Sequence, residues 1–433
     1  MKKRTEPVSE LLGTMKLRVI IPFLSFALFL LYSTSTNAGI PAVNLKKNRC
    51  SIVEMIDGLK HLKIFAPQEQ VNPVADSSIT KQDIVYEYYV TLIGKQSPVD
   101  FDYNQYVRKY IDIYTTERQE QVSQMLGLAR MYFPLFEEYL DKYQLPLELK
   151  YLAVVESALN PMAVSKTGSV GLWQFNINTA RMFNLNVSSF VDERMDPIKS
   201  TEAACQYLQY LFRTFNSWQL AIAAYNVGPG AINNAIERSG GELNFWKLYH
   251  YLPEAAQNYV PAFIAAAYIM QNYANHNIPV ATPLITYSQT DTVLVNRPAS
   301  FLAISSSIDV PVEIIRFLNP TYKLDYIPEN VDPQTLRLPV RKTVTFIHNQ
   351  ETIYANTEKP KFANGNKNDS SARLKVVHTV RSGESMHKIA IMYGCTVEDI
   401  QGWNPKIDST LSVGQNILIW TNKTRFEDLN IQN

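Results

Sequence analysis

The sequence has little cysteine, little histidine and almost no net charge. Its three cysteines, Cys50, Cys205 and Cys395, lie far apart in 433 residues, which is not the pattern of a disulfide scaffold or a zinc site. The six histidines show no metal-ligand spacing, and neither a P-loop nor a dinucleotide fingerprint occurs. A formal net charge of +1 argues against a nucleic-acid binder, which usually presents a strongly basic face. We therefore expect no metal, no cofactor and no nucleic acid.

Long apolar runs are also scarce, and the clearest one lies at the N-terminus. Basic residues at 2–4, 16 and 18 precede an apolar run over 19–31, and small or polar residues follow as far as Ala38. This layout is typical of a secretory signal peptide, which we expect over 1–38. The run is short for a membrane span, which needs about 20 residues. We expect export to the cell envelope or periplasm, and leave open a start at Met15 and membrane association through an uncleaved anchor.

At 433 residues the chain is long enough for several domains, and its 46% hydrophobic content allows at least one full core. Residues 39–102 show no motif, and their role stays open. Over 103–280 apolar residues recur at helical spacing, which predicts a compact α-helical domain. Within it, Asp196-Pro197 predicts a helix cap followed by a first-turn proline, and a last long helix is expected from Pro253 to Tyr273.

One carboxylate of this domain is expected on an apolar helix face. The stretch 145–157 predicts a helix with four residues on that face: Leu149, Leu152, Ala153 and Glu156. Loss of hydration favours the protonated form of a carboxyl group, so Glu156 could act as a general acid. From these residues alone, a helix-end carboxylate that reaches solvent or pairs with a lysine is an equal alternative.

An internal repeat begins near residue 285, where short β-rich pieces replace the helical pattern. The offset that carries Asn319 to Asn404 also carries Ile315 to Ile400, without a gap. Each copy predicts the order strand, helix, helix, strand.

We expect the first copy over 285–341 and the second over 376–421. The segment 342–375 is a predicted linker because it contains a polar, glycine-containing run. Residues 422–433 would form a tail.

The second copy resembles a LysM domain, a small βααβ module that binds glycans containing N-acetylglucosamine. The residues that carry the resemblance are Val380, the turn Ser382-Gly383-Glu384-Ser385, Ile389, Ile400, Asn404, Gly414 and Ile417. The first copy resembles a degenerate LysM domain, because Asn296-Arg297-Pro298-Ala299 replaces the glycine-containing turn. Glycan binding by this copy stays open, and a simple spacer is the alternative for either copy.

The helical domain carries motifs that resemble the lysozyme-like catalytic (SLT) domain of lytic murein transglycosylases. They are ESALNP at 156–161, GSVGLWQF at 168–175, AYNVGPG at 224–230 and a weaker element around Tyr259. With the LysM copies, the layout resembles the membrane-bound murein transglycosylase D group. The chain departs at Trp173, where the family commonly has methionine. The resemblance implies a multidomain fold, with a mainly α lysozyme-like domain at 103–280 followed by small α+β modules.

The same resemblance implies a substrate and a set of site residues. The substrate would be peptidoglycan strands, cleaved between N-acetylmuramic acid and N-acetylglucosamine without water. Glu156 would protonate the bond and then take the proton of the muramoyl C6 hydroxyl, which leaves a 1,6-anhydro end. The residues expected to hold the sugars are Ser165, Gln174, Tyr225 and Asn226, with Tyr259 near the acid and Trp173 stacking on a sugar face.

Two other functions stay open. A hydrolytic lysozyme would need a second carboxylate; we expect Asp196 to be a helix cap, and Asp192 and Glu193 to lie in a solvated loop. A catalytically inactive wall-binding scaffold is the other alternative, against which the presence of Glu156 and Gln174 argues. We expect a monomer.

Overall fold

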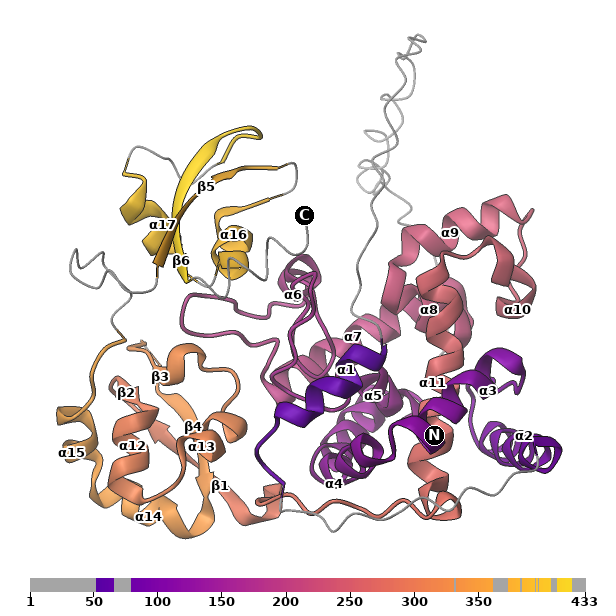
Figure 1. The fold of residues 1–433 in the computed structure, drawn as a ribbon, viewed down its shortest axis with the longest axis horizontal. Coiled ribbons are helices and arrows are strands. Elements are labelled where there is room, and N and C mark those ends of the chain that lie inside the picture. The colour runs from indigo at the N-terminus through magenta and orange to yellow at the C-terminus, as the bar shows by residue number, and fades with distance from the viewer. Residues whose placement is uncertain are drawn as a thin grey trace, which may run out of the picture. The chain divides into compact units, whose positions relative to one another are not determined.

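The computed structural model describes residues 52–65, 79–330, 332–360, 373–381, 384–393, 395, 397–405 and 411–422. The leader expected over 1–38, the polar run near 364–371 and nearly all of the expected tail lie outside these residues. Among the described helices, none has the length and apolar character needed to cross a membrane. The described chain is multidomain and mainly helical, with two small α+β parts (Figure 1).

Helices of the N-terminal segment pack onto the helical domain. They are α1 (Ile52–Gly58), η1 (Leu59–His61) and α2 (Ile79–Lys95). Leu59 and Val90 are fully buried in the same core as the helical domain. The N-terminal segment, whose role stayed open in the sequence analysis, therefore supplies part of that core.

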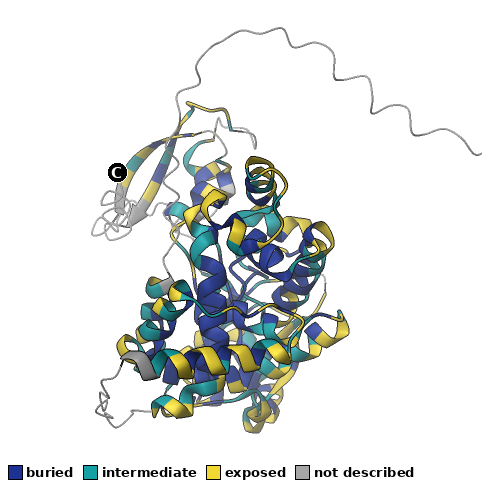
Figure 2. Ribbon diagram, turned by 90° about the vertical axis from the view of Figure 1, so that its right-hand side faces the viewer, coloured by how far each residue is buried: buried dark blue, intermediate teal, exposed yellow. Residues whose placement is uncertain are grey.

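The helical domain is built around α11 (Glu254–Asn272), which contacts α2, α3, α5 and α8. Its middle is almost entirely buried because small alanines let neighbours approach on several sides. Figure 2 shows the buried residues gathered in the interior of the helical part. The remaining elements are α3 (Gln105–Asp112), η2 (Ile113–Glu117), α4 (Gln119–Lys142), η3 (Leu147–Lys150), α5 (Tyr151–Ser157), α6 (Ile177–Met182), α7 (Pro197–Phe215), α8 (Trp218–Val227), α9 (Pro229–Arg238), α10 (Phe245–Leu248), η4 (Tyr249–Tyr251) and η5 (Tyr273–His276).

Two local predictions are confirmed in this domain. The side chain of Asp196 caps α7 by accepting hydrogen bonds from the backbone N–H groups of Ile198 and Lys199, and Pro197 begins the helix. The last long helix, expected from Pro253 to Tyr273, is α11.

The first repeat copy continues the same hydrophobic core. Its elements are η6 (Tyr287–Gln289), β1 (Thr290–Val295), β2 (Ala299–Ser300), α12 (Phe301–Ile308), α13 (Val312–Leu318), η7 (Lys323–Asp325), β3 (Tyr326–Ile327), β4 (Gln334–Pro339), α14 (Val340–His348) and α15 (Gln350–Ala355). Strands β1 and β4 pair antiparallel, as do β2 and β3.

The expectation of a linker from residue 342 was wrong. Helices α14 and α15 occupy 340–355 and contact β1 and α12. Phe346 and Ile353 are fully buried, so this segment gains enough apolar burial to fold onto the module. A polar composition further along the segment concealed this helical pattern.

The second copy has the predicted order of elements and a core of its own. Its elements are β5 (Arg373–Thr379), α16 (Met386–Tyr393), α17 (Val397–Trp403) and β6 (Asn416–Asn422), with β5 and β6 antiparallel. Ile389, Ile400 and Ile417 are fully buried in a cluster separate from the larger core.

The two copies share an asparagine that ties the second helix to the closing strand. Asn319 Nδ2 donates to Ile315 O and Arg337 O, both at 2.8 Å, and Asn319 Oδ1 accepts from Arg337 N at 2.7 Å. Asn404 makes the same three bonds, to Ile400 O and Leu418 O at 2.7 Å and from Leu418 N at 2.8 Å. These equivalent bonds support the repeat that the sequence offset predicted.

Candidate active site

Glu156 lies in the last turn of α5. Leu149, Leu152 and Ala153 are fully buried, as the predicted stripe requires, while Glu156 is half-buried. The helix stops because Ala158 adopts a left-handed conformation with φ 52°. The buried apolar face thus holds the helix in place, and the Glu156 carboxyl group at its end lies partly accessible to solvent.

A tyrosine from the central helix holds this carboxyl group. Tyr259, on α11 and 3% exposed, donates its hydroxyl hydrogen to Glu156 Oε1 at 2.6 Å. A hydrogen bond from a hydroxyl to a carboxylate is short and strong, and it restricts the carboxylate to one orientation. The weak fourth motif and the first motif therefore meet in the structure.

The third motif, at 224–230, also contributes a residue near Glu156. The hydroxyl of Tyr225, on α8, donates to Trp173 O at 2.9 Å. Burial raises the pKa of Tyr225 well above its usual value, and the nearby charge of Glu156 raises it further. Tyr225 stays neutral, so it can hold the 168–175 segment as a hydrogen-bond donor.

Two side chains in these motifs have buried acceptor oxygens with no hydrogen-bond partner. Gln174 donates through Nε2 to Ala163 O at 3.1 Å and Gly171 O at 2.9 Å, while its Oε1 is unpartnered. Asn226 Oδ1 is unpartnered as well. Leaving a buried acceptor unpaired costs about 1–3 kcal/mol. Both oxygens lie in motifs that converge on Glu156, so they are free to accept hydrogen bonds beside the candidate acid.

The segment before Gln174 forms tight turns. Ser165 Oγ accepts from Ser169 N at 2.9 Å, so this predicted sugar-binding hydroxyl also stabilises the turn. Ser157 Oγ, next to Glu156, donates to Leu172 O at 2.9 Å. The end of α5 and the 168–175 segment are therefore fastened to each other.

The prediction that Trp173 stacks on a sugar was wrong. Its side chain is fully buried, its Nε1 donates to Thr201 Oγ1 at 2.9 Å, and its ring lies 4.9 Å from that of Phe136. A ring enclosed in this way has no face for a ligand. Residue type alone does not distinguish a core tryptophan from a sugar platform, whereas burial does.

The three carboxylates considered as catalytic partners have structural roles. Asp192 is 3% exposed and paired with Arg194, so the expectation of a solvated loop was wrong for it. Glu193 Oε1 pairs with Lys199 Nζ at 2.5 Å, and Asp196 caps α7. Their contacts explain all three without a catalytic role.

Sequence reasoning missed two contributions to this region. Glu54 of α1 pairs with Lys166 at 3.0 Å, which joins the N-terminal segment to the turn that contains Ser165. Arg194 is 1% exposed and binds the backbone of the 168–175 segment. The apolar spacing of Ile56 and Leu59 was a signal for the first, but no sequence signal distinguished Arg194 from a surface arginine.

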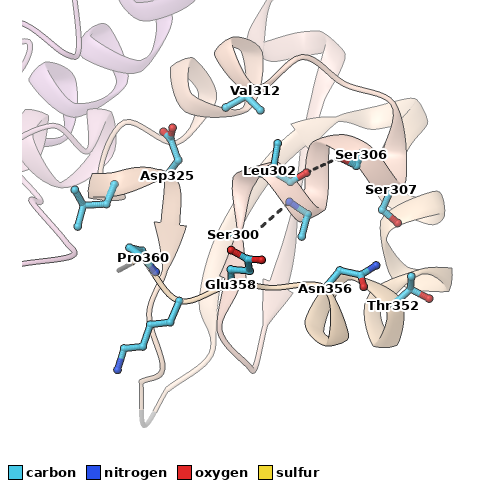
Figure 3. A pocket seen from close by; sticks show the side chains of 13 residues that line it. Ser300, Leu302, Ser306, Ser307, Val312, Asp325, Thr352, Asn356, Glu358 and Pro360 are labelled. Atoms are coloured by element: carbon cyan, nitrogen blue, oxygen red, sulfur yellow. Dashed lines mark hydrogen bonds between the residues drawn. The ribbon is translucent and has the colours of Figure 1, made fainter. Parts of the chain in front are cut away.

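A separate hollow of about 890 Å³ lies on the first repeat copy (Figure 3). Its wall includes the largely exposed Leu302 of α12, hydroxyl groups such as Ser306, and Asp325 of η7. Figure 3 shows Asn356, Glu358 and Pro360 along one side. The segment after α15 thus borders this hollow.

Comparison with known proteins identifies three domains in the chain. A transglycosylase SLT domain matches residues 134–247, the LysM-like domain of lytic transglycosylase MltD matches 289–355, and a LysM domain matches 378–420. The LysM-like match includes α14 and α15. The chain is thus of the class that joins an SLT domain to LysM-type modules.

Similar proteins narrow this class. Membrane-bound lytic murein transglycosylase D of Escherichia coli (strain K12) is 29% identical over 282 residues, which cover 64% of this chain and 61% of the relative. The soluble lytic murein transglycosylase of the same strain is 32% identical over 119 residues, 26% of this chain and 18% of that protein. The chain is thus similar to membrane-bound lytic murein transglycosylase D, and it spans 61% of the length of that relative.

Among solved structures, the 70 kDa soluble lytic transglycosylase from Escherichia coli is 21% identical. The match covers 55% of this chain and 43% of that chain, with a TM-score of 0.31.

Proposed function

We propose that this protein is a peptidoglycan lytic transglycosylase that cleaves the β-1,4 bond between N-acetylmuramic acid and N-acetylglucosamine. The products would carry 1,6-anhydromuramoyl ends. The observation that carries the proposal is the placement of Glu156 at a helix end, bonded to Tyr259, with unpartnered acceptors in the neighbouring motifs. The SLT match over 134–247 contains all of these groups except Tyr259.

One carboxyl group suffices for this reaction because the nucleophile, the C6 hydroxyl, is part of the substrate and no second carboxyl group is needed to activate water. Protonated Glu156 gives its proton to the glycosidic oxygen while the bond from that oxygen to C1 breaks. The resulting carboxylate takes the proton of the C6 hydroxyl, whose oxygen then bonds to C1. Glu156 ends protonated, and no water is consumed.

Tyr259 would stabilise the stage of the reaction at which Glu156 is a carboxylate. Its hydroxyl donates to Glu156 Oε1, and that bond strengthens when Glu156 has lost its proton. The oxocarbenium-like sugar then faces a carboxylate that is held in one orientation. This is stabilisation of a charge that develops during the reaction.

The other predicted residues would bind the sugars. Gln174 Oε1 and Asn226 Oδ1 would accept from the N–H and O–H groups of the glycan, which satisfies their missing bonds. Ser165 would contribute its hydroxyl at the turn. Tyr225 would fix the 168–175 segment and present its ring, since its hydroxyl already donates to Trp173 O.

The last module would hold the enzyme on its substrate. A LysM domain that binds glycan strands raises the local concentration of cleavable bonds around the tethered active site. We infer export to the cell envelope from the leader-like N-terminus, with action as a monomer. Membrane association is consistent with the name of the D-type relative.

The mass of the released fragments tests the function. Purified peptidoglycan is digested with the intact protein, and we expect muropeptides lighter by one water than their reducing-end equivalents. Reducing ends would instead show a lysozyme, and absence of fragments would show a binding scaffold.

A pair of variants assigns the acid. Glu156→Gln should abolish fragment release while retaining sedimentation with peptidoglycan. Glu120→Gln removes an equal charge from an exposed position and should cleave like the wild type. Cleavage by the first variant at the wild-type rate would reject Glu156 as the acid.

A further inference from the structure

Arg194 is a buried cation that joins both ends of the 168–175 segment. Its Nη1 donates to Gly168 O at 3.0 Å and to Phe175 O at 3.2 Å. Its Nε and Nη2 donate to the two carboxylate oxygens of Asp192, at 2.9 and 2.7 Å. A buried ion pair is expensive unless its hydrogen bonds are satisfied, and here they are. Gln174 lies between the two carbonyls that Arg194 holds.

The backbone of Arg194 also fits closely against this segment. Its carbonyl oxygen lies 1.9 Å from the place where a Cβ on residue 171 would be, so only Gly171 allows the approach. The position of residues 192–194 therefore determines the position of 168–175.

Residues 188–192 are in turn paired with the first repeat copy. Asp192 N donates to Thr321 O at 2.8 Å, and Lys323 N donates to Phe190 O at 2.7 Å, around a β-bridge between Val191 and Tyr322. The side chains add to this, because Thr321 Oγ1 donates to Asp192 O at 3.3 Å and Lys323 Nζ donates to Ser188 O at 3.1 Å.

We propose that the first repeat copy positions the substrate-binding segment of the catalytic domain, through the pairing of 321–323 with 188–192 and through Arg194. The module then supports the active site from outside. Arg194 and Lys323 are positioning residues that act through Gln174. The proposal deepens the proposed function, on which it rests for the identity of the substrate.

Hydrogen exchange in the full chain tests the coupling directly. Lys323→Ala removes the side-chain bond to Ser188, and Lys323→Pro also removes the backbone N–H that bonds Phe190. Tyr322 already has φ −89° and ψ 112°, the extended conformation that a residue before proline adopts. We expect exchange of peptide 168–175 to rise by about fivefold in the alanine variant and further in the proline variant.

A matched control lies in the same module. Lys342 Nζ donates to Ile308 O at 2.7 Å, a bond of the same kind that does not involve the catalytic domain. Lys342→Ala should leave exchange of 168–175 unchanged. Protection of β1 and β4 reports whether the module itself stays folded, and if Lys323→Pro loses it, the Lys323→Ala result decides.

Kinetics on solubilised glycan strands separate positioning from general stability. We expect KM to rise about fivefold in Lys323→Ala with a smaller change in kcat, because Gln174 loses its support while Tyr259 still holds Glu156. Unchanged exchange at 168–175 in both Lys323 variants, or a loss confined to kcat, would overturn the proposal. Exchange does not depend on cleavage, so a wild-type protein without activity would reject the proposed function and still test this coupling.

Discussion

Gly171 occupies a position where the backbone of another segment leaves no room for a side chain. Its φ is 86°, and a Cβ would approach Arg194 O to 1.9 Å. Gly168, three residues earlier, has a similar φ of 81°, but the place where its Cβ would lie is open space. A side chain at Gly168 would therefore meet only backbone strain, whereas one at Gly171 would meet both strain and a steric clash.

This difference predicts unequal effects of the same substitution. Gly168→Ala should lower the free energy of unfolding by about 1–2 kcal/mol, the cost of a left-handed alanine. Gly171→Ala adds the clash with Arg194 O and should exceed about 4 kcal/mol, or distort the segment instead. Urea unfolding of both variants measures the difference, and equal losses would contradict the close approach.

Tyr259 offers a second comparison at the residue scale. Tyr259→Phe removes the hydroxyl that bonds Glu156, and we expect kcat to fall about ten- to hundredfold, as for a lost charge-assisted hydrogen bond. Tyr268, on the same helix, also has a buried hydroxyl, bonded to His276 Nε2 at 2.8 Å. Tyr268→Phe should keep wild-type kcat, measured by release of soluble fragments. A comparable loss in both variants would indicate that helix packing, rather than the bond to Glu156, accounts for the effect.

The residues of the site differ in how far the sequence could predict them. Gln174 and Tyr259 could be predicted because their motifs resemble those of a known family, and the structure places Tyr259 against Glu156. Trp173 was misassigned because a large aromatic ring suits a core as well as a ligand. Asp192 was misassigned because its burial depends on Arg194 and on backbone more than a hundred residues away.

Elements from distant parts of the chain meet around α11. Helix α2 contacts one side of it through Tyr86, whose ring lies 5.3 Å from that of Tyr268 and 5.9 Å from that of His276 in η5. This aromatic cluster joins the N-terminal segment to the centre of the catalytic domain. The sequence did not predict it because residues 86 and 276 form no local pattern.

The histidine of this cluster predicts a pH dependence of stability. Burial lowers the pKa of His276, so the folded protein resists a proton that the unfolded chain accepts below about 6.5. Its contribution is complete above that pH and declines as the pH falls towards the lowered folded value. Melting temperatures at pH 7 and 5 should differ less in His276→Gln than in the wild type. Equal differences in the two proteins would rule out this contribution.

Over the whole molecule, the described residues form two separate hydrophobic cores. One extends from Ile56 through the helical domain to Ile353 in α15, and the other belongs to the second repeat copy. The repeat itself could be found from sequence because one offset relates the two copies without a gap as far as Asn319 and Asn404. The sequence could not show that only one described copy packs onto the helical domain. The contacts of Thr321 and Lys323 that join them involve mainly backbone atoms, which have no residue signature.

Substitution of the two equivalent asparagines tests which hydrophobic core each copy belongs to. Asn319→Ala and Asn404→Ala each remove three hydrogen bonds and should cost about 2–4 kcal/mol. Calorimetry of the full chain should show two transitions. The first variant should shift the transition of the catalytic unit, and the second only that of the LysM domain. A single transition moved by both variants would contradict separate cores.

The shared asparagine also bears on how such chains diverge. Both copies keep the bonds that define the fold, yet only the first shares the hydrophobic core of the helical domain. Over evolutionary time the last module could be lost, exchanged or multiplied with little consequence for the packing of the helical domain. The first would be inherited with the catalytic domain as one unit, so changes in wall affinity should accumulate at the C-terminal end.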